Sequence, residues 1–538
     1  MSSQNFNMKS YMKGALLLTI AALIVKVLSA VYRVPFQNLV GDQGFYVYQQ
    51  VYPFVAIFVT WTASGVAVAI SKMLAELDAQ SSDNLSHRQS ILRVIFQYLT
   101  VLSLVFFCAL FFGAPLLANI MGDELLARPM QIGAIVTLFM PILAIFKGSF
   151  QSRGVMNPIA YSQVFEQTIR VSVILIGTVI IMSTTQSIYG AGTMAIFGTV
   201  VGELAGIVLL YYFMRKEGMF VQVAPIKLAK WPIIKEITLF SLSVSMSSLL
   251  LLTFQLIDSF TIFSSLLKAG IDYDSAQIMK GIYDRGQPLV QLGLVIASSL
   301  ALAIVPLVAF KSKSKTGRGA KPFINLTYRA TLVFAVAASF GLMFVMPYVN
   351  QALFKEDVFS SILSIYALQT IPLAIIITMT AILQGYSKLF VPAIFIVISC
   401  GIKLLGNILF IPTFELDGAV LTSNISLFGC AIAIIIYVRK ILQTSLAPLT
   451  YYIKLISAVI LMGIAIKGTS LLMGMLIVTS EISRVSAVLY CIICVSVGAF
   501  VFMTAVAKMR VLKEKEWFLI PLGRRMAAYQ LLLNRKRK

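Results

Sequence analysis

The chain has 538 residues, of which 59% are hydrophobic and only 12% are charged, and its mean hydropathy is +0.91. A soluble core of that length could not bury so many apolar side chains, so the composition excludes a soluble globular protein and indicates a membrane protein. The formal net charge of +22 would suit a nucleic-acid partner only if the basic residues gathered on one surface.

Apolar runs follow one another along the chain and predict fourteen transmembrane helices, since one crossing needs about 20 such residues. The runs are centred near Leu23, Ile57, Val105, Met140, Ile174, Gly198, Leu249, Ile296, Ala335, Ala374, Val397, Ala431, Ala458 and Cys491. The first run carries Lys26 and Arg33 and has no small-residue cleavage site, so we interpret it as a retained helix. We expect an all-α polytopic membrane protein.

Basic residues concentrate in alternate loops. The intervening loops hold only Arg128, Lys268, Lys355 and Arg484. The positive-inside rule then places both termini in the cytoplasm, on the inner side of a membrane that the chain crosses many times. The excess charge is explained by topology, and we predict no nucleic-acid partner.

A weak internal repeat predicts two lobes. Tyr48 and Pro53 open one apolar run with the same spacing as Tyr283 and Pro288 in a later run. We therefore expect two six-helix lobes, 1–220 and 221–445, around a central cavity, with two extra helices in 446–510. Residues 511–538 form a basic, amphipathic cytoplasmic tail, which we expect to lie on the membrane surface.

The cysteines and the histidine do not indicate a metal site, a redox pair or a catalytic residue. All five cysteines lie inside apolar runs, so we interpret even Cys491 and Cys494 as packing residues. His87 is the only histidine and has no ligand partners in its loop, so we predict neither a metal site nor histidine catalysis.

Basic residues remain within or beside the apolar runs after the loops are assigned: Lys26, Arg33, Arg170, Lys280, Arg285, Arg329, Lys403, Lys454 and Lys467. Each costs about 2.5–3.5 kcal/mol near the centre of a membrane helix. The acids at similar depth are fewer, namely Glu166, Glu203, Asp258 and Asp284. A basic, water-filled cavity that binds an anion, such as a pyrophosphate, accounts for the excess.

Structural explanations stay open for several of these charges. Lys280 and Asp284, four residues apart, can pair on one helix, and so can Glu166 and Arg170. Arg33 can reach the outer headgroups along its apolar stem. Lys26 and Arg33, seven residues apart, share one face of the first helix.

Several segments together resemble the multidrug/oligosaccharidyl-lipid/polysaccharide exporter (MOP) superfamily, and within it the lipid II flippase (MurJ) and stage V sporulation protein B-like transporters. The segments are 26–41, 48–50, 65–72, 283–288 and 299–306. The resemblance implies fourteen helices, a central cavity and alternating access to the two sides of the membrane.

The resemblance also implies the site residues. The substrate-binding positions map onto Lys26, Arg33, Asp284 and Arg285, to which we add Lys280 and Gln49. Asp258 and Asn407 fall where some members hold a sodium ion, although Ile411 replaces a second acid. Further departures are Ile57 and Phe58 in place of an arginine pair and glutamines at positions 49 and 50 in place of an acid.

We predict a flippase, with no enzyme activity, that moves a polyprenyl-pyrophosphate-linked glycan, first of all lipid II, to the outer leaflet. It would need no bound cofactor, and Na⁺, H⁺ or the membrane potential alone would drive it. Its partners would be the anionic substrate and membrane lipids, with wall-synthesis partners undetermined. The alternatives are another undecaprenyl-linked polysaccharide unit, a multidrug/cation antiporter, a membrane glycosyltransferase or polymerase, and a scaffold.

Overall fold

The structure is a computed structural model and describes residues 8–80, 85–220, 226–295, 297–300, 321–386, 388, 390–443, 445–476, 483–517 and 523–534. Those residues form helices joined by short turns, with no strand among them. Eleven helical stretches are long and apolar enough to cross a membrane. The predicted all-α polytopic fold is therefore confirmed.

Two of the eleven stretches are long enough for two crossings each. Ile20–Asp78 spans 59 residues and Phe390–Leu442 spans 53. Non-helical backbone interrupts the first at Gly41 (φ 69°) and the second at Glu415 (φ 51°). The predicted span near Ile296 falls partly on residue 296 and residues 301–320, which lie outside the described ranges.

The chain divides into two compact units, and the boundary between them passes through two helices. Unit 1 comprises Met1–Asp284 and Leu404–Glu415, and unit 2 comprises Arg285–Lys403 and Leu416–Lys538. These units do not follow the predicted lobes, because the helix after residue 220 packs on the helices of the N-terminal half. The lobe boundaries drawn from the repeat stay a prediction.

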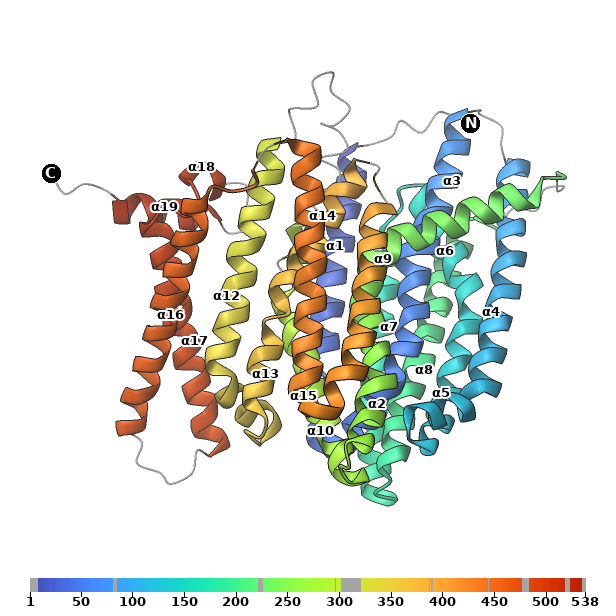
Figure 1. The fold of residues 1–538 in the computed structure, drawn as a ribbon. Coiled ribbons are helices and arrows are strands. Elements are labelled where there is room, and N and C mark those ends of the chain that lie inside the picture. The colour runs from blue at the N-terminus through green and yellow to red at the C-terminus, as the bar shows by residue number, and fades with distance from the viewer. Residues whose placement is uncertain are drawn as a thin grey trace. The chain divides into compact units, whose positions relative to one another are not determined.

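Unit 1 is a bundle of long helices (Figure 1). Its elements are α1 (Met8–Val31), α2 (Arg33–Thr60), the π-helix η1 (Trp61–Val66), α3 (Ala67–Gln80), α4 (Leu85–Met121), η2 (Glu124–Leu126), α5 (Ala127–Ala134), η3 (Ile135–Phe139), α6 (Met140–Ser152), α7 (Asn157–Thr184), α8 (Ile188–Lys216), α9 (Lys230–Lys268) and α10 (Tyr273–Gly293), the last of which continues into unit 2.

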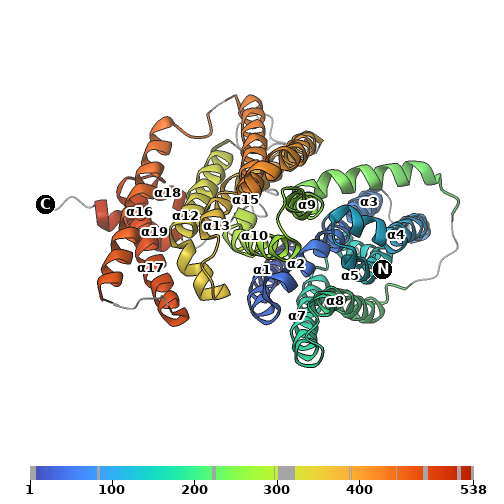
Figure 2. The same cartoon turned by 60° about the horizontal axis from the view of Figure 1, so that its bottom comes forward.

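Small residues bring α7 and α8 side by side (Figure 2). A Cβ atom on Gly202 would lie 2.7 Å from the Cβ of Arg170, and one on Gly198 would lie 2.6 Å from Ile174. Membrane helices approach this closely where glycine removes the side chain. The glycines of α8 therefore set the position of Arg170.

The first part of α9 lies crosswise over α3 and α4, and the rest turns into the bundle (Figures 1 and 2). The Trp61 indole donates a hydrogen bond to Ser241 Oγ at 3.1 Å, and Tyr98 and Thr238 share one at 2.7 Å. Lys72 lies 3.5 Å from Glu236. These contacts fix the crosswise segment to η1, α3 and α4.

Asp123 joins several elements at the ends of the unit 1 helices that lie away from the crosswise segment of α9. Its side chain caps η2 by accepting from the Leu125 N–H, and it also accepts hydrogen bonds from Tyr46 and Tyr189 at 3.1 and 2.7 Å. Nearby, the Asp272 carboxylate accepts from the Ser275 N–H at 3.0 Å, and this bond lowers the pKa of Asp272.

Unit 2 continues with α12 (Lys321–Phe354), α13 (Ser360–Ala367), α14 (Thr370–Gly385), α15 (Phe390–Leu442), α16 (Leu449–Leu476), α17 (Arg484–Lys508), α18 (Glu514–Trp517) and α19 (Gly523–Asn534). Residues 404–415 of α15 belong to unit 1. Cys491 and Cys494 lie in α17 as free thiols.

The described part of the C-terminal tail forms two short helices, α18 and α19. The Trp517 indole is buried and donates to Gln530 Oε1 at 2.6 Å, while Asn534 donates to the Ala507 carbonyl at 3.2 Å. The tail therefore packs on the end of α17. Leu531 and Leu532 remain exposed, and the predicted contact with the membrane surface stays a prediction.

Candidate functional site

Aromatic rings surround Arg33, the first residue of α2. Arg33 is 1% exposed, and its guanidinium carbon lies 4.8 Å from the centre of the Tyr52 ring. Arg170, which comes from α7 and is also buried, lies 5.8 Å from the same ring centre. Tyr48 packs on Tyr52 and shares a hydrogen bond with Tyr32. Because the face of a tyrosine ring attracts cations, Tyr52 holds two positive charges in one place.

Lys26 lies in α1 and Arg33 is the first residue of α2, and the two residues have different surroundings. Tyr32 between them has helical dihedral angles and donates its N–H to the Leu28 carbonyl at 3.1 Å. Lys26 is nevertheless exposed, whereas Arg33 is buried. Arg33 lies in the aromatic cluster around Tyr52.

Glu166 and Arg170 do not form the i,i+4 ion pair considered for them. Glu166 lies 3.7 Å from Lys147 of α6, and Arg170 lies against Tyr52. Glu203 of α8 is buried and interacts with both Glu166 and Arg170. Lys147 and Arg170 therefore balance two acids, and Arg33 adds a further positive charge to this part of unit 1.

Lys280 and Asp284 form the expected ion pair within α10. The Lys280 ammonium lies 2.6 Å from each carboxylate oxygen of Asp284, and both residues are buried. Removing one partner from such a pair leaves an uncompensated buried charge. The pair therefore accounts for Lys280 without a ligand, and its proposed part in substrate binding stays a prediction.

Asp258 and Asn407, far apart in sequence, meet inside unit 1. Asn407 Nδ2 donates to Asp258 Oδ1 at 3.0 Å and to Thr261 Oγ1 at 2.8 Å, and the Tyr283 hydroxyl donates to Asp258 Oδ2 at 3.3 Å. Asn407 Oδ1 is buried and has no hydrogen-bond partner among the described residues. Turning the amide over would bring that oxygen beside Asp258 and Thr261. Carboxylate, amide and hydroxyl oxygens of this kind suit a hard cation.

Arg285 is the first residue of unit 2 and is fully buried. It donates to Asn350 Oδ1 at 3.1 Å and to Glu356 Oε2 at 3.2 Å, and its guanidinium carbon lies 5.0 Å from the centre of the Phe354 ring. The Glu356 side chain is 51% exposed. An anion that bound Arg285 would therefore compete with a carboxylate that can turn out to water.

The remaining predicted site residue, Gln49, is buried in α2. Its neighbour Gln50 donates to the Ser259 carbonyl of α9 at 3.2 Å. The structure thus brings together Lys280 with Asp284, and Asp258 with Asn407. It places Arg33 with Tyr52 and leaves Lys26 exposed.

Sequence reasoning missed the residues that hold these charges in place: Tyr32, Tyr48, Tyr52, Lys147, Thr261, Asn350 and Glu356. Lys147 lies buried in α6. The tyrosines carried a usable signal, since Tyr32 is next to Arg33 in sequence and Tyr48 and Tyr52, four residues apart, lie on one face of a helix.

A bundle of membrane-crossing helices that buries ion pairs and cations along its length defines a membrane transporter fold. Solved structures share it: the chain superposes on "Lipid II flippase MurJ, inward closed conformation" with a TM-score of 0.66 at 16% identity, covering 92% of this chain and 99% of that one. An inward-facing multidrug resistance MATE family transporter of the MOP superfamily matches with a TM-score of 0.59 at 13% identity, covering 81% and 98%.

The chain belongs to the polysaccharide biosynthesis protein family, whose model matches residues 11–310. It is 32% identical over 520 residues to "Uncharacterized membrane protein YabM" of Bacillus subtilis (strain 168), covering 96% of each chain. It is 23% identical to "Lipid II flippase MurJ" of the same organism, covering 91% of this chain and 94% of the relative. "Stage V sporulation protein B" of that organism is 34% identical over 208 residues, or 38% of this chain. The family membership agrees with the predicted resemblance, and a solved transporter of the MOP superfamily shares the fold.

Proposed function

We propose that this protein is a flippase that moves a polyprenyl-pyrophosphate-linked glycan from the inner to the outer leaflet of a bacterial cytoplasmic membrane, with lipid II as the first candidate. The observation that carries the proposal is the pair of buried guanidinium groups, Arg33 and Arg170, on one Tyr52 ring. Buried cations are costly in a membrane and are retained where they serve an ion or substrate path. Arginine suits phosphate because its planar fork donates two parallel hydrogen bonds.

The family match and the relatives support a transporter of lipid-linked glycans. They also argue against a glycosyltransferase, a polymerase or a scaffold, because the named relatives include a flippase. A multidrug/cation antiporter of the same fold is the second candidate. Such a protein would present acids to cationic drugs, whereas the site described here is rich in buried bases.

Substrate binding would follow from the charges at hand. Within unit 1 the phosphates would meet Arg33, while Gln49, Lys280 and Asp284 would contact the sugars or hold the helices in register. Arg285 of unit 2 stays a predicted substrate-binding residue, and its guanidinium would be open to an anion once Glu356 has turned away. Lys26, which is exposed, would meet the phosphates before they reach Arg33. The two lobes would alternate between openings to the cytoplasm and to the outside around a central cavity, with both termini in the cytoplasm.

Two energy sources are available to such a cycle. Moving a negative charge outward is favoured by an inside-negative potential by about 2.3 kcal/mol per charge per 100 mV. The oxygens of Asp258, Thr261 and Asn407 could in addition bind Na⁺, or Asp258 could carry H⁺. A coupling ion at this position would tie export to the movement of α9 against residues 404–415.

A bacterium whose only lipid II flippase can be depleted provides the test. Wild-type protein, Arg285→Ala and the exposed control Arg215→Ala are expressed at matched membrane abundance, and survival and outer-leaflet lipid II are measured. We expect rescue by the wild type and by Arg215→Ala but not by Arg285→Ala. Rescue by all three would keep the function and refute Arg285 as a site residue. Failure of a well-expressed wild type would reject lipid II and favour another undecaprenyl-linked glycan.

A further inference from the structure

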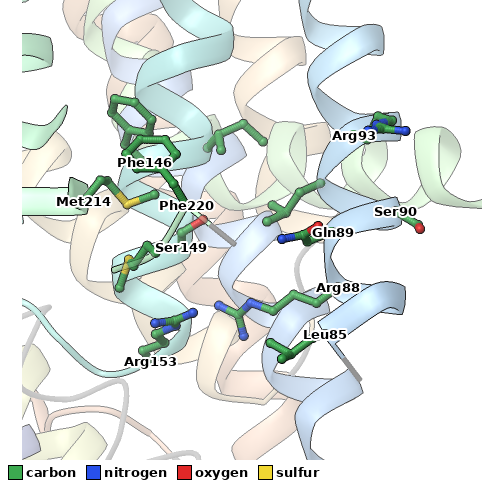
Figure 3. Close-up of a pocket in the computed structure, with 13 residues that line it drawn as sticks. Leu85, Arg88, Gln89, Ser90, Arg93, Phe146, Ser149, Arg153, Met214 and Phe220 are labelled. Carbon is green, nitrogen blue, oxygen red and sulfur yellow. The ribbon is translucent and has the colours of Figure 1, made fainter. Parts of the chain in front are cut away.

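A second site lies in unit 1, and none of the buried charges just described lines it. It is a cavity of about 240 Å³ where α3 ends, α4 begins, and α6 and α8 end (Figure 3). The proposed topology puts this end of the unit at the cytoplasmic surface of the membrane. The proposed substrate path uses none of the residues that line the cavity.

Two arginines face each other at one side of this cavity. Arg88 of α4 and Arg153, which follows α6, point toward one another, while Arg93 points away from both (Figure 3). Arg88 is buried and bonds to Asp78 and Ser152 at 2.7 Å each. Arg153 keeps contact with solvent, and no carboxylate of the described chain lies within 4.0 Å of its guanidinium nitrogens. Partial burial, followed by the positive charge of Arg88, lowers the pKa of Arg153.

A hydroxyl group points into the same space. Ser149 is 4% exposed, and within the described part of the chain its Oγ has no hydrogen-bond partner. Figure 3 shows the hydroxyl directed toward the side of the cavity on which Gln89 lies. A buried hydroxyl without a partner is unfavourable, and a bound oxygen acceptor would remove that cost.

One wall of the cavity is apolar and is formed by Phe146, Met214 and Phe220 (Figure 3). Leu92 and Ile145 also line the cavity, as do the polar residues Gln89 and Ser90. A free inorganic anion would gain nothing from such a wall. An anion that carries a hydrocarbon chain would contact the arginines with its charged group and the apolar wall with its chain.

We propose that this cavity binds the phosphate head of an anionic membrane amphiphile, with the phosphate between Arg88 and Arg153 and the first part of the chain against Phe146 and Phe220. The cavity is smaller than the roughly 300–1,000 Å³ of sites for drug-sized ligands, so it takes a headgroup and not a disaccharide. Phospholipids of the bilayer and polyprenyl phosphates share this chemistry. The site does not depend on which glycan the protein exports.

Thermal unfolding of the full chain in a neutral detergent tests the proposal. Wild type, Arg153→Gln and the exposed control Arg215→Gln are titrated with phosphatidylglycerol, undecaprenyl phosphate, phosphatidylcholine and inorganic pyrophosphate. Phosphatidylcholine is the control for charge, because its cationic choline group is repelled by the positively charged arginines. We expect phosphatidylglycerol or undecaprenyl phosphate to raise the Tm of wild type and Arg215→Gln, with a half-saturating concentration about tenfold or more higher for Arg153→Gln.

The arms distinguish the source of the phosphate. Protection by phosphatidylglycerol would identify a bilayer phospholipid, and protection by undecaprenyl phosphate alone would identify a polyprenyl carrier. The proposal would be overturned if every amphiphile raised the Tm of Arg153→Gln as much as that of the wild type. It would also be overturned if inorganic pyrophosphate raised the Tm of the wild type as much as the amphiphiles do. If Arg153→Gln does not fold, Ser149→Ala, which leaves both arginines in place, must also weaken the protection, and an unchanged titration would again overturn the proposal.

Discussion

Asn407 donates a hydrogen bond to Asp258 across 3.0 Å, although 149 residues separate them in the chain. The contact joins residues 404–415 to α9 within unit 1. It places an amide group, a carboxylate and a hydroxyl group beside one another. An isolated buried carboxylate would be costly, so Asp258 is kept in place by donors or exchanges them for a cation.

Replacing Asp258 by asparagine should therefore remove any cation dependence of transport. The amide keeps the size of the side chain but loses the negative charge on which cation binding depends. Export would be measured in proteoliposomes over a range of Na⁺ concentrations and pH values. We expect Asp258→Asn to flatten both profiles, whereas Asp274→Asn, a change at an exposed acid of α10, should leave them unaltered. Profiles of Asp258→Asn that match the wild type would exclude Asp258 as the coupling residue.

Lys280→Met should destabilise the protein by about 3–5 kcal/mol, because it leaves the Asp284 carboxylate buried without its partner. The double variant Lys280→Met, Asp284→Leu should recover most of that loss, since apolar residues of similar size can replace a buried ion pair. Unfolding in detergent measures both. A double variant that is less stable than Lys280→Met would show that Asp284 stabilises the protein mainly through partners other than Lys280.

Gly65→Ala should lower stability by about 1–3 kcal/mol, because η1 and α9 approach too closely for a side chain. A Cβ at Gly65 would lie 2.7 Å from the Ser241 carbonyl oxygen and 2.8 Å from Trp61 Cδ1. Gly113→Ala is the matched control, since nothing lies within 4 Å of a Cβ there. Alanine at that helical position should be neutral or stabilise by about 0.5–1 kcal/mol. Equal unfolding temperatures for the two variants would contradict the close packing of η1 on α9.

The sequence predicted the helices well because lipid imposes a simple rule: a crossing needs about 20 apolar residues with every backbone group paired internally. It did not predict where the helices break. Glu415 has a left-handed φ of 51°, and Trp61–Val66 forms a π-helix, yet neither position carries a local pattern that requires it. At the π-helix, Gly65 lies against the backbone of α9, a contact that no local pattern in the sequence reveals.

Pairings of charges were predictable only within a helix. Lys280 and Asp284 lie four residues apart, so their ion pair follows from helical geometry. Glu166 had a partner at the same spacing, but α6 brings Lys147 to it instead. The partners of Arg285 come from the end of α12 and the turn that follows it, and no spacing rule reaches them. Asp258 and Asn407 were paired through a family resemblance, not by spacing.

The most direct test of the account is the rate at which purified protein moves fluorescent lipid II across a proteoliposome membrane under an imposed potential. Arg33→Gln removes one of the two guanidinium groups on Tyr52, and Arg215→Gln removes an exposed one. We expect the transport rate of the wild type and of Arg215→Gln to increase with the potential. At equal protein abundance, the rate of Arg33→Gln should be lower by about tenfold or more. Equal rates for Arg33→Gln and the wild type, with both insensitive to the potential, would contradict the account.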